Sequence, residues 1–434
     1  MSQYRAYPTY KDSGIEWIGQ VPEHWKIAQI KRISALNPKK STLSEEKDSL
    51  CTFLPMEKLR TNAVTLDETR PIHEVYDGYS YFCDGDILIA KVTPCFENGN
   101  IAVANGLVNG IGFGSTEINV LRVNGKGHNR FLYYRLQEEQ FRTIAKSEMR
   151  GTGGLKRVPT DLFESFTIGL PDTDEQATIA ATLDQETACI DALIEKKTRF
   201  IELLKEKRQA LITHAVTKGL DPNVKMKDSG VEWIGQMPEH WDVKPFFALV
   251  TELNRKNVGL AETNILSLSY GNIIQKPETR NMGLTPESYE TYQIVESGEI
   301  VFRFTDLQND KRSLRSAQVT QRGIITSAYM AVKPHSIDST YFAWLMRSYD
   351  LCKVFYAMGG GLRQSLKFED VRRLPVLIPP VDEQSEITNT INARTARIDA
   401  LVEKTEQSIT LLKERRAAFI TAAVTGQIDL RGEQ

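Results

Sequence analysis

The apolar positions of residues 174–217 are typical of one long helix. Apolar residues recur there every three or four positions, and neither proline nor glycine interrupts the run. The stripe consists of Ile179, Leu183, Ile190, Leu193, Phe200, Leu204 and Leu211. About 40 helical residues at ~1.5 Å each form a rod of about 60 Å, which cannot bury such a stripe against itself. We therefore expect a partner element of matching length.

Residues 382–425 repeat this pattern at a constant offset. The letters DEQ at 174–176 return at 382–384, and IDAL at 190–193 returns at 398–401. The second stripe consists of Ile387, Ile391, Ile398, Leu401, Leu412 and Phe419. A repeat that stays in phase indicates an architectural unit, and two such helices pack most simply as a two-stranded coiled coil. The residues that we expect to pair are Ile190, Leu193, Leu204, Leu211, Ile398, Leu401, Leu412 and Phe419.

A second repeat lies ahead of each globular stretch. Residues 11–25 read KDSGIEWIGQVPEHW, and residues 227–241 read KDSGVEWIGQMPEHW. Glycines and a proline predict turns in both copies, and the tryptophans are large apolar anchors. His24 and His240 could serve in catalysis. We favour a structural role for both, because no nucleophile or metal-ligand spacing accompanies them.

The stretch after each such repeat has the pattern of strands followed by a helix. Alternation and β-branched residues predict strands at 85–91 and 117–123, which correspond to 298–304 and 328–333. Helices are expected around 131–149 and 340–358. Each of these helices is followed by glycines: Gly151, Gly153 and Gly154 in the first half, and Gly359, Gly360 and Gly361 in the second. Outside these anchors the two halves diverge strongly.

These patterns predict an α+β chain in which globular domains alternate with long helices. The expected boundaries are a first globular domain at 1–170, a helix at 171–220, a second globular domain at 221–379 and a helix at 380–434. The repeat implies an internal pseudo-twofold. If the helices run antiparallel, the globular domains lie at opposite ends of the pair.

Composition narrows the class of protein. The chain of 434 residues suits two to four domains, with 41% apolar and 25% charged residues. No apolar run approaches the ~18 residues of a membrane span, and no signal peptide precedes the first repeat. Five scattered cysteines without a CxxC pair favour a reducing, cytoplasmic location over a disulfide or zinc framework. The net charge of −2 means that cations for a nucleic acid would have to cluster locally.

The glycine loops are the most suggestive chemical feature. They contain no Gly-Lys-Ser/Thr and so are not P-loops. Glycine would permit close approach of the backbone to phosphate, with charge from Lys156, Arg157, Arg363 and Lys367. The alternative is a helix C-cap beside solvated cations. The presence of the loop in both halves raises the weight of the phosphate interpretation.

Enzyme motifs are not supported. Pro171-Asp172 followed by Glu195-Lys196-Lys197 resembles a nuclease pattern, but the Glu and Lys lie within the rod, where a solvated charged face is expected. The sequence has no Asn-Pro-Pro-aromatic motif of adenine methyltransferases and no G-x-G-x-x-G. The residues alone therefore indicate a tandem recognition protein without catalysis, with a coiled-coil scaffold that does not bind DNA as the alternative.

The motifs together resemble the specificity subunits of type I restriction-modification systems. The resemblance covers nearly the whole chain and rests on the doubled KDSG…PEHW element, the GDILI strand at 85–89, the Gly-Gly-Leu and Gly-Leu-Arg loops, and the DEQ…IDAL rods. It implies two target recognition domains, each of which reads one half of a bipartite, asymmetric sequence in double-stranded DNA. The rods would set the gap between the half-sites.

The resemblance also implies the partners and the location of the chemistry. Two modification subunits would dock on the body and methylate adenine, and restriction subunits, which combine motor and nuclease, would join them. S-adenosylmethionine, ATP and Mg would belong to those partners, and this chain would hold no catalytic residue, cofactor or metal. Divergence between the halves agrees with two different half-sites, because side chains read base edges.

The candidate DNA-binding residues come from both halves. Around the glycine loops they are Gly153, Gly154, Lys156, Arg157, Arg363 and Lys367. Three arginines without obvious counterparts in the first half are candidates for readout by the second half: Arg303, Arg312 and Arg315.

Overall fold

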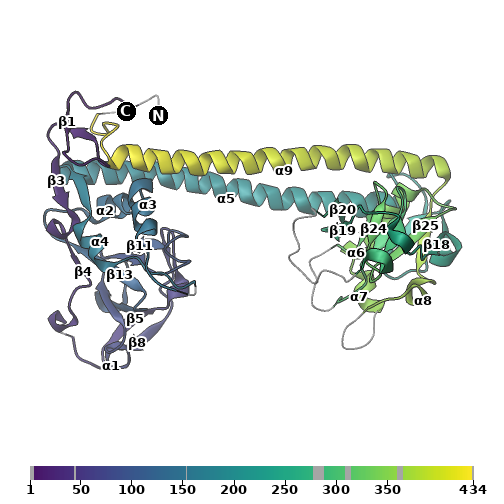
Figure 1. Ribbon diagram of the computed structural model, residues 1–434, viewed down its shortest axis with the longest axis horizontal. Coiled ribbons are helices and arrows are strands. Elements are labelled where there is room, and N and C mark those ends of the chain that lie inside the picture. Colours follow the sequence, from purple (N-terminus) through teal and green to yellow (C-terminus); the bar gives the residue numbers. More distant parts are fainter. Residues whose placement is uncertain are drawn as a thin grey trace. The chain divides into compact units, whose positions relative to one another are not determined.

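The computed structural model describes residues 4–43, 45–152, 154–276, 288–307, 314–358 and 365–432. Helices and strands lie in largely separate stretches of these ranges, in agreement with the expected α+β class (Figure 1). The chain divides into two compact units: unit 1 is Met1–Lys197 with Gln407–Gln434, and unit 2 is Thr198–Glu406. Two long helices, α5 (Thr173–Lys218) and α9 (Val381–Val424), contribute residues to both units.

The main sheet of unit 1 is antiparallel, with the strand order β11-β10-β13-β4. Its strands are β4 (Ser34–Leu36), β10 (Ile87–Ala90), β11 (Ile101–Val103) and β13 (Ile118–Val123). The strands predicted at 85–91 and 117–123 are confirmed as β10 and β13. All of β10 is buried, as befits a strand with a neighbour on each side.

A second sheet of unit 1 has the order β8-β5-β12-β9, with β5 and β12 parallel. Its strands are β5 (Leu50–Leu54), β8 (Thr69–Pro71), β9 (Ser80–Cys83) and β12 (Ile111–Gly114), and α1 (Ile72–Val75) follows β8. Smaller antiparallel pairs are β1 (Tyr10–Asp12) with β2 (Gln20–Pro22), β3 (Lys26–Gln29) with β14 (Thr167–Leu170), and β6 (Leu59–Arg60) with β7 (Ala63–Val64).

Unit 2 repeats the main sheet of unit 1 in the order β23-β22-β25-β18, again antiparallel. Its strands are β18 (Val250–Leu253), β22 (Ile300–Phe302), β23 (Ser316–Gln318) and β25 (Met330–Pro334). The other pairs are β15 (Met226–Asp228) with β16 (Gln236–Pro238), β17 (Asp242–Pro245) with β26 (Pro375–Ile378), β19 (Leu266–Ser269) with β20 (Asn272–Gln275), and β21 (Gln293–Val295) with β24 (Gly323–Ile325).

The helix expected in each half is broken in two. In unit 1, α2 (Asn129–Arg135) is followed by α3 (Glu139–Ser147), because the Glu138 carboxylate accepts backbone N–H groups of Gln140 and Phe141 and starts a new helix. In unit 2, α6 (Ser339–Leu351) is followed by α7 (Val354–Met358), with Lys353 at a φ of 62° between them. The short helices α4 (Thr160–Ser165) and α8 (Phe368–Val371) precede the last strand of each globular part.

Each unit combines one end of α5 with the opposite end of α9 in its core. In unit 1 the start of α5 packs with the end of α9, through Ile179 and Phe419. In unit 2 the end of α5 and the start of α9 share one core, through Ile212 and Ile387. The same ion pair occurs in each unit: Arg416 Nε lies 2.9 Å from Asp191 Oδ1 in unit 1. In unit 2, Arg208 Nε lies 2.9 Å from Asp399 Oδ1.

The buried positions of α5 and α9 correct the expected stripe. Steps of four and three residues connect the covered positions, as in a heptad seam. These positions are 190, 194, 197, 201, 204, 208 and 211 in α5, and 398, 402, 405, 409, 412, 416 and 419 in α9. Leu193 and Leu401 are 42% and 47% exposed, so their assignment to the seam is wrong. The seam passes through the next residue, Ile194 or Val402, because a seam needs steps that average 3.5 residues.

The repeated tryptophans fasten each globular part to its helix. In unit 1, the Trp25 indole N–H donates to Glu175 Oε1 at 3.1 Å, and His24 Nε2 lies 2.7 Å from Glu175 Oε2. In unit 2, the equivalent Trp241 N–H donates to Glu383 Oε2 at 3.0 Å, and His240 Nε2 lies 2.7 Å from that oxygen. Each histidine thus holds a helix carboxylate, which favours the structural role.

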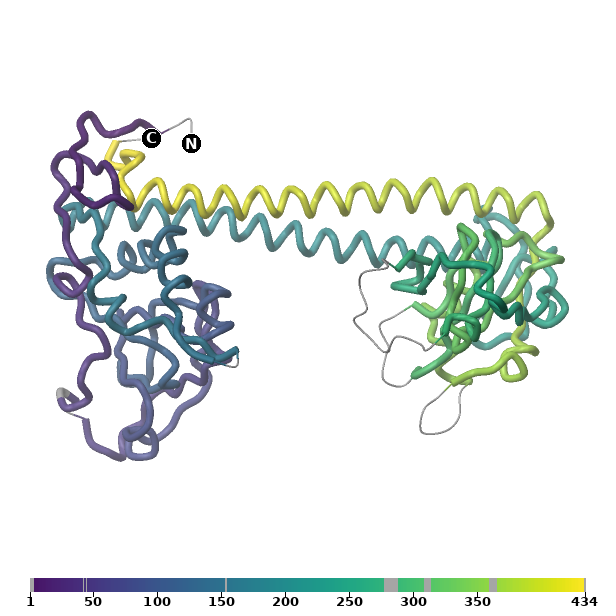
Figure 2. The backbone as a smooth tube through the Cα atoms, in the orientation of Figure 1, coloured from purple at the N-terminus to yellow at the C-terminus, as the bar shows by residue number. Residues whose placement is uncertain are grey.

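Unit 1 also brings together segments from the beginning and end of the described chain (Figure 2). The Asp429 N–H donates to the Arg5 carbonyl at 2.7 Å, and the Tyr10 hydroxyl donates to the Gly426 carbonyl at 3.0 Å. The Tyr7 hydroxyl donates to Glu175 Oε1 at 2.7 Å. These segments cover the Glu175 carboxylate, whose side chain is 3% exposed.

Candidate nucleic-acid interface

The glycine loop of unit 1 is a tight hairpin. The backbone N–H groups of Arg150 and Arg157 each donate to the other residue's carbonyl, at 2.9 and 2.8 Å. Gly151 has a φ of +141°, and a Cβ there would lie 2.3 Å from the Leu155 carbonyl oxygen, so the turn needs glycine. For this loop the helix C-cap alternative is therefore wrong, since α3 ends before the hairpin. For the second half it stays untested, because Gly359, Gly360 and Gly361 fall outside the described residues. Gly154 lies in the turn at a φ of +81°, and Gly153 falls outside the described residues.

Lys156 is anchored by its backbone and exposed through its side chain. Its carbonyl accepts the Thr93 N–H at 2.9 Å, and its own N–H donates to the Thr93 hydroxyl at 3.2 Å. In the part of the chain that the structure describes, no acidic side chain forms an ion pair with its ammonium group. A cation held in this way at a loop is suited to a phosphate contact.

Arg157 is already paired within the protein. Its Nη2 and Nε donate to the two Glu117 carboxylate oxygens at 2.6 and 2.9 Å. The Arg157 guanidinium, through these hydrogen bonds, holds the pKa of the Glu117 carboxyl below its usual range. A phosphate would have to compete with Glu117 for Arg157, so Lys156 is the stronger candidate of the two.

The hairpin presents two exposed residues that the sequence analysis missed. The Arg150 side chain is 76% exposed beside Glu148, and Leu155 is 58% exposed. Their position next to the glycines was the available signal. A cation beside an exposed apolar residue could contact a phosphate and a base or sugar, respectively.

Unit 2 builds an equivalent edge from three segments. The Arg303 N–H donates to the Arg315 carbonyl at 2.8 Å, and the Leu366 N–H donates to the Phe304 carbonyl at 3.0 Å. In unit 1, Ala90 and Val158 make the matching bonds to Asn100 and Lys91. Arg303, Arg315 and Lys367 therefore lie on neighbouring segments. The other candidates of this half, Arg312 and Arg363, fall outside the described residues.

Arg315 is a structural residue, so its assignment to DNA readout is wrong. It is fully buried, and its guanidinium donates to the Thr305 and Asp306 carbonyls at 3.2 and 3.3 Å and to the Tyr356 hydroxyl at 3.2 Å. Backbone carbonyls that face the interior need such a donor. Arg315 thus stabilises the backbone at Thr305 and Asp306, which follow β22 in the chain.

Lys367 and Arg303 keep their places as candidates, with different accessibility. Lys367 is exposed at the start of α8, where its backbone N–H donates to the Asp370 carboxylate at 2.7 Å. The Arg303 side chain is half-buried. An exposed lysine on a capped helix turn can reach a phosphate without rearrangement of the backbone.

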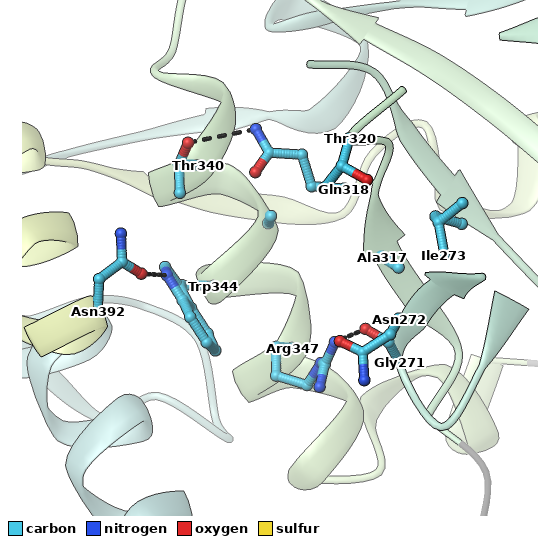
Figure 3. Close-up of a pocket in the computed structure, with 11 residues that line it drawn as sticks. Gly271, Asn272, Ile273, Ala317, Gln318, Thr320, Thr340, Trp344, Arg347 and Asn392 are labelled. Atoms are coloured by element: carbon cyan, nitrogen blue, oxygen red, sulfur yellow. Dashed lines mark hydrogen bonds between the residues drawn. The ribbon is translucent and has the colours of Figure 1, made fainter. Parts of the chain in front are cut away.

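Unit 2 contains a cavity of about 310 Å³ beside α9. Figure 3 shows Trp344 of α6 facing Asn392 of α9, to which its indole N–H donates at 3.1 Å. Arg347 closes another side, where it donates to the Gly271 carbonyl, and burial lowers its pKa to about 10. At the positions equivalent to Thr340 and Asn392, unit 1 has Arg130 and Asp184, which form an ion pair. The two units therefore use different side chains at matching positions.

Within the described ranges, His, Cys, Asp and Glu side chains form no cluster of three or more that could hold a metal ion. None of the helices in those ranges combines the length and the apolar character that a bilayer-spanning segment needs.

Comparison with known proteins relates residues 22–203 to a known DNA specificity domain. Residues 22–203 match the profile of the family described as "Type I restriction modification DNA specificity domain". The chain is 33% identical over 164 residues to the specificity subunit of the type I restriction enzyme EcoEI, and 37% identical over 163 residues to that of EcoAI, both from Escherichia coli. These matches cover 38% and 37% of this chain, and only 28% and 27% of the relatives' own lengths.

The fold is similar to a solved chain from a study of complex assembly and conformational transition in the type I R-M system. The similarity covers 94% of this chain and 99% of that chain, with a TM-score of 0.71 and 14% sequence identity. The domain match and the two relatives, which are both named specificity subunits, lead to one conclusion: residues 22–203 of this chain form a type I restriction modification DNA specificity domain.

Proposed function

We propose that this chain selects the DNA site of a type I restriction-modification complex, and that each globular part reads one half of a bipartite, asymmetric sequence. One observation carries this proposal: the main sheets of the two units have the same strand order, whereas the side chains at matching positions differ. A shared scaffold with different side chains is what two different half-sites require, because base edges are read by side chains. The specificity-domain match at 22–203 supports the same function.

In this proposal α5 and α9 form one antiparallel coiled coil about an internal pseudo-twofold, and this coiled coil sets the gap between the half-sites. The heptad steps of covered positions support a coiled coil. The ion pairs support the twofold, because Asp191 with Arg416 and Asp399 with Arg208 are the same interaction with the helices exchanged. Such reciprocity is the mark of an isologous contact.

Two copies of one modification subunit would dock on the repeated surface. Large apolar side chains are exposed at matching positions of both units: Trp17 and Trp233 are 47% and 41% exposed. Leu193 and Leu401 match as well, as do Leu203 and Leu411 at 47% and 64%. Exposed apolar side chains in matching sets suit a repeated protein partner.

The chemistry would reside in those partners. S-adenosylmethionine would serve adenine methylation by the modification subunits, and ATP with Mg would serve the restriction subunits. This chain would supply the choice of sequence and the scaffold, without a catalytic residue, cofactor or metal of its own.

Mapping adenine methylation across a genome tests the DNA function. Cells that express this chain with its modification subunit should methylate one bipartite, asymmetric motif, which disappears when this chain is deleted. Exchange of residues 227–379 for those of a relative should alter one half of the motif and keep the other. Assembly of a complex without any such motif would overturn the proposal, and failure of assembly would favour the scaffold alternative.

The docking proposal has a separate test in the mass of the purified complex. Trp17→Ala and Trp233→Ala should each abolish the binding of one modification subunit, so that each variant binds only the other. The double variant should bind neither subunit with comparable affinity. Met226→Ala removes another exposed apolar side chain, 37% exposed, and serves as the control. Full occupancy by two subunits in the double variant would refute docking at the tryptophans.

A further inference from the structure

Unit 2 contains an acidic cavity of about 530 Å³ at the start of α9. Four carboxylates line it, from Asp221, Asp382, Glu383 and Glu386, together with His240. Its other lining residues are Gly219, Leu220, Val224 and Pro380. The lining contains no lysine or arginine, so this cavity attracts cations and repels phosphate.

Unit 1 shows what fills the matching place there. Arg431 donates from Nη2 and Nε to the Asp429 carboxylate, at 2.8 and 2.9 Å. Its Nε also lies 3.8 Å from Glu175 Oε1, and its guanidinium lies 4.9 Å from the centre of the Tyr7 ring. An arginine stacked on a tyrosine thus covers two carboxylates.

The repeat replaces this arginine in unit 2. Asp221 is equivalent to Asp429, and each carboxylate accepts the backbone N–H two residues later, at 2.9 and 3.0 Å. The residue that donates this N–H is Arg431 in unit 1 and Asn223 in unit 2. Asparagine is neutral and shorter than arginine. Asp221 therefore keeps the hydrogen bond of the turn but has no guanidinium from Asn223 to neutralise its carboxylate.

The second carboxylate is also left open. Glu383 Oε2 binds both His240 and Trp241, whereas no described residue donates a hydrogen bond to Glu383 Oε1. In unit 1 the equivalent Glu175 Oε1 accepts the Tyr7 hydroxyl and the Trp25 indole. Accordingly the side chain of Glu383 is 23% exposed, against 3% for Glu175.

We propose that this cavity of unit 2 receives an arginine side chain, with a neighbouring aromatic residue, from a partner polypeptide. The guanidinium would bridge Asp221 and Glu383 as Arg431 does for their equivalents, and Asp382 and Glu386 would add attraction from the rim. The site is distinct from the proposed DNA contacts and does not depend on them.

Titration of the full-length chain with N-acetyl-tyrosyl-arginine amide tests this inference. We expect saturable binding by calorimetry, and loss of binding when citrulline, a neutral isostere, replaces arginine. The indole N–H resonance of Trp241 should shift because its acceptor carboxylate gains a donor, while that of Trp25 stays in place. Equal binding of the citrulline peptide, or no saturation up to about 10 mM, would overturn the proposal.

Three variants make the test specific. Asp382→Asn and Glu386→Gln should each weaken binding about two- to fivefold, because each removes one exposed charge from the rim. Asp174→Asn, at the equivalent position of unit 1, should leave the affinity unchanged. Asn223→Arg should supply the missing guanidinium from within and abolish peptide binding. Undiminished binding by the folded Asn223→Arg variant would contradict the assigned location.

Discussion

At the scale of single residues, charge by itself does not distinguish a DNA contact from a structural support. Lys156, Arg157 and Arg315 are all cations near a predicted glycine loop or strand edge. In the structure Lys156 is exposed, Arg157 is held by Glu117, and Arg315 is buried against backbone carbonyls. The partner of each cation therefore decides how much it can offer to a phosphate.

Lys156 should contribute more to DNA binding than Arg157. Lys156→Gln should lower the magnitude of the negative slope of log affinity against log salt by about 0.9, which corresponds to the loss of one phosphate contact. Arg157→Gln should lower it by less than half of that, because Arg157 must first leave Glu117. Fluorescence anisotropy over a range of salt concentrations, with DNA that carries the motif found by methylation mapping, gives both slopes. Glu117→Gln, which releases Arg157, should strengthen binding, and equal slopes for the two cation variants would contradict this ranking.

Arg315 should act on stability. Arg315→Met should reduce the free energy of unfolding by about 2–4 kcal/mol, because the Thr305 and Asp306 carbonyls lose their donor inside the protein. Lys367→Met, at an exposed position, should stay within about 0.5 kcal/mol of the parent chain. Urea denaturation measures both values. A stable Arg315→Met variant that loses one half-site would instead restore Arg315 as a DNA contact.

At the scale of elements, the seam formed by the covered positions of α5 and α9 differs slightly from the simplest apolar stripe. Leucine alone does not mark this seam, since Leu193, Leu203, Leu401 and Leu411 are all exposed. Covered positions include Thr405 and the ion-paired Arg416 instead. Apolar residues outside the seam are then available to a partner.

Adjacent leucines provide a matched pair for this interpretation. Leu204 is 7% exposed and Leu203 is 47% exposed. Leu204→Ala should lower the free energy of unfolding by about 2–4 kcal/mol, because it leaves a cavity in the seam. Leu203→Ala should change it by about 0.5 kcal/mol or less and should weaken binding of the modification subunit. Chemical denaturation and a binding titration separate the two effects, and equal destabilisation would place both leucines in the seam.

At the scale of the whole molecule, the repeat places matching sheets, helix ends and carboxylate anchors in each unit. Glu175 and Glu383 hold the repeated His-Trp pairs in the same way. Gln176 accepts the backbone N–H of His128, the N-cap residue of α2, at 2.9 Å, and Gln384 accepts that of Asp338, the N-cap residue of α6, at 2.8 Å. A globular part joined so closely to its helix would pass a change in helix length on to the DNA.

An insertion in the long helices should therefore lengthen the recognised gap. One heptad after Lys197, matched by one after Glu406, adds about 10 Å to each helix, the length of about three base pairs. We expect a longer gap, by at most about three base pairs, between unchanged half-sites. Methylation mapping of the variant reads both. A gap and activity identical to those of the parent chain would contradict the proposed spacing function of α5 and α9.

The sequence by itself determined the repeats, the long helices and the central strands. These follow from periodicity and turn residues, which act over a few neighbouring positions, so β10, β13, α5 and α9 were predicted close to their observed bounds. The same local signals overlooked the breaks at Glu138 and Lys353, where a cap or a left-handed residue interrupts a helix.

Only the tertiary structure decided which residues are buried, paired or exposed. The burial of Arg315, the hold of Glu117 on Arg157 and the exposure of Leu193 arise from contacts between segments far apart in the chain, which no local pattern encodes. The open carboxylate of Glu383 likewise became visible only beside its covered equivalent, Glu175. Hydrogen bonds and packing across the fold determine which of two similar side chains remains available for a partner.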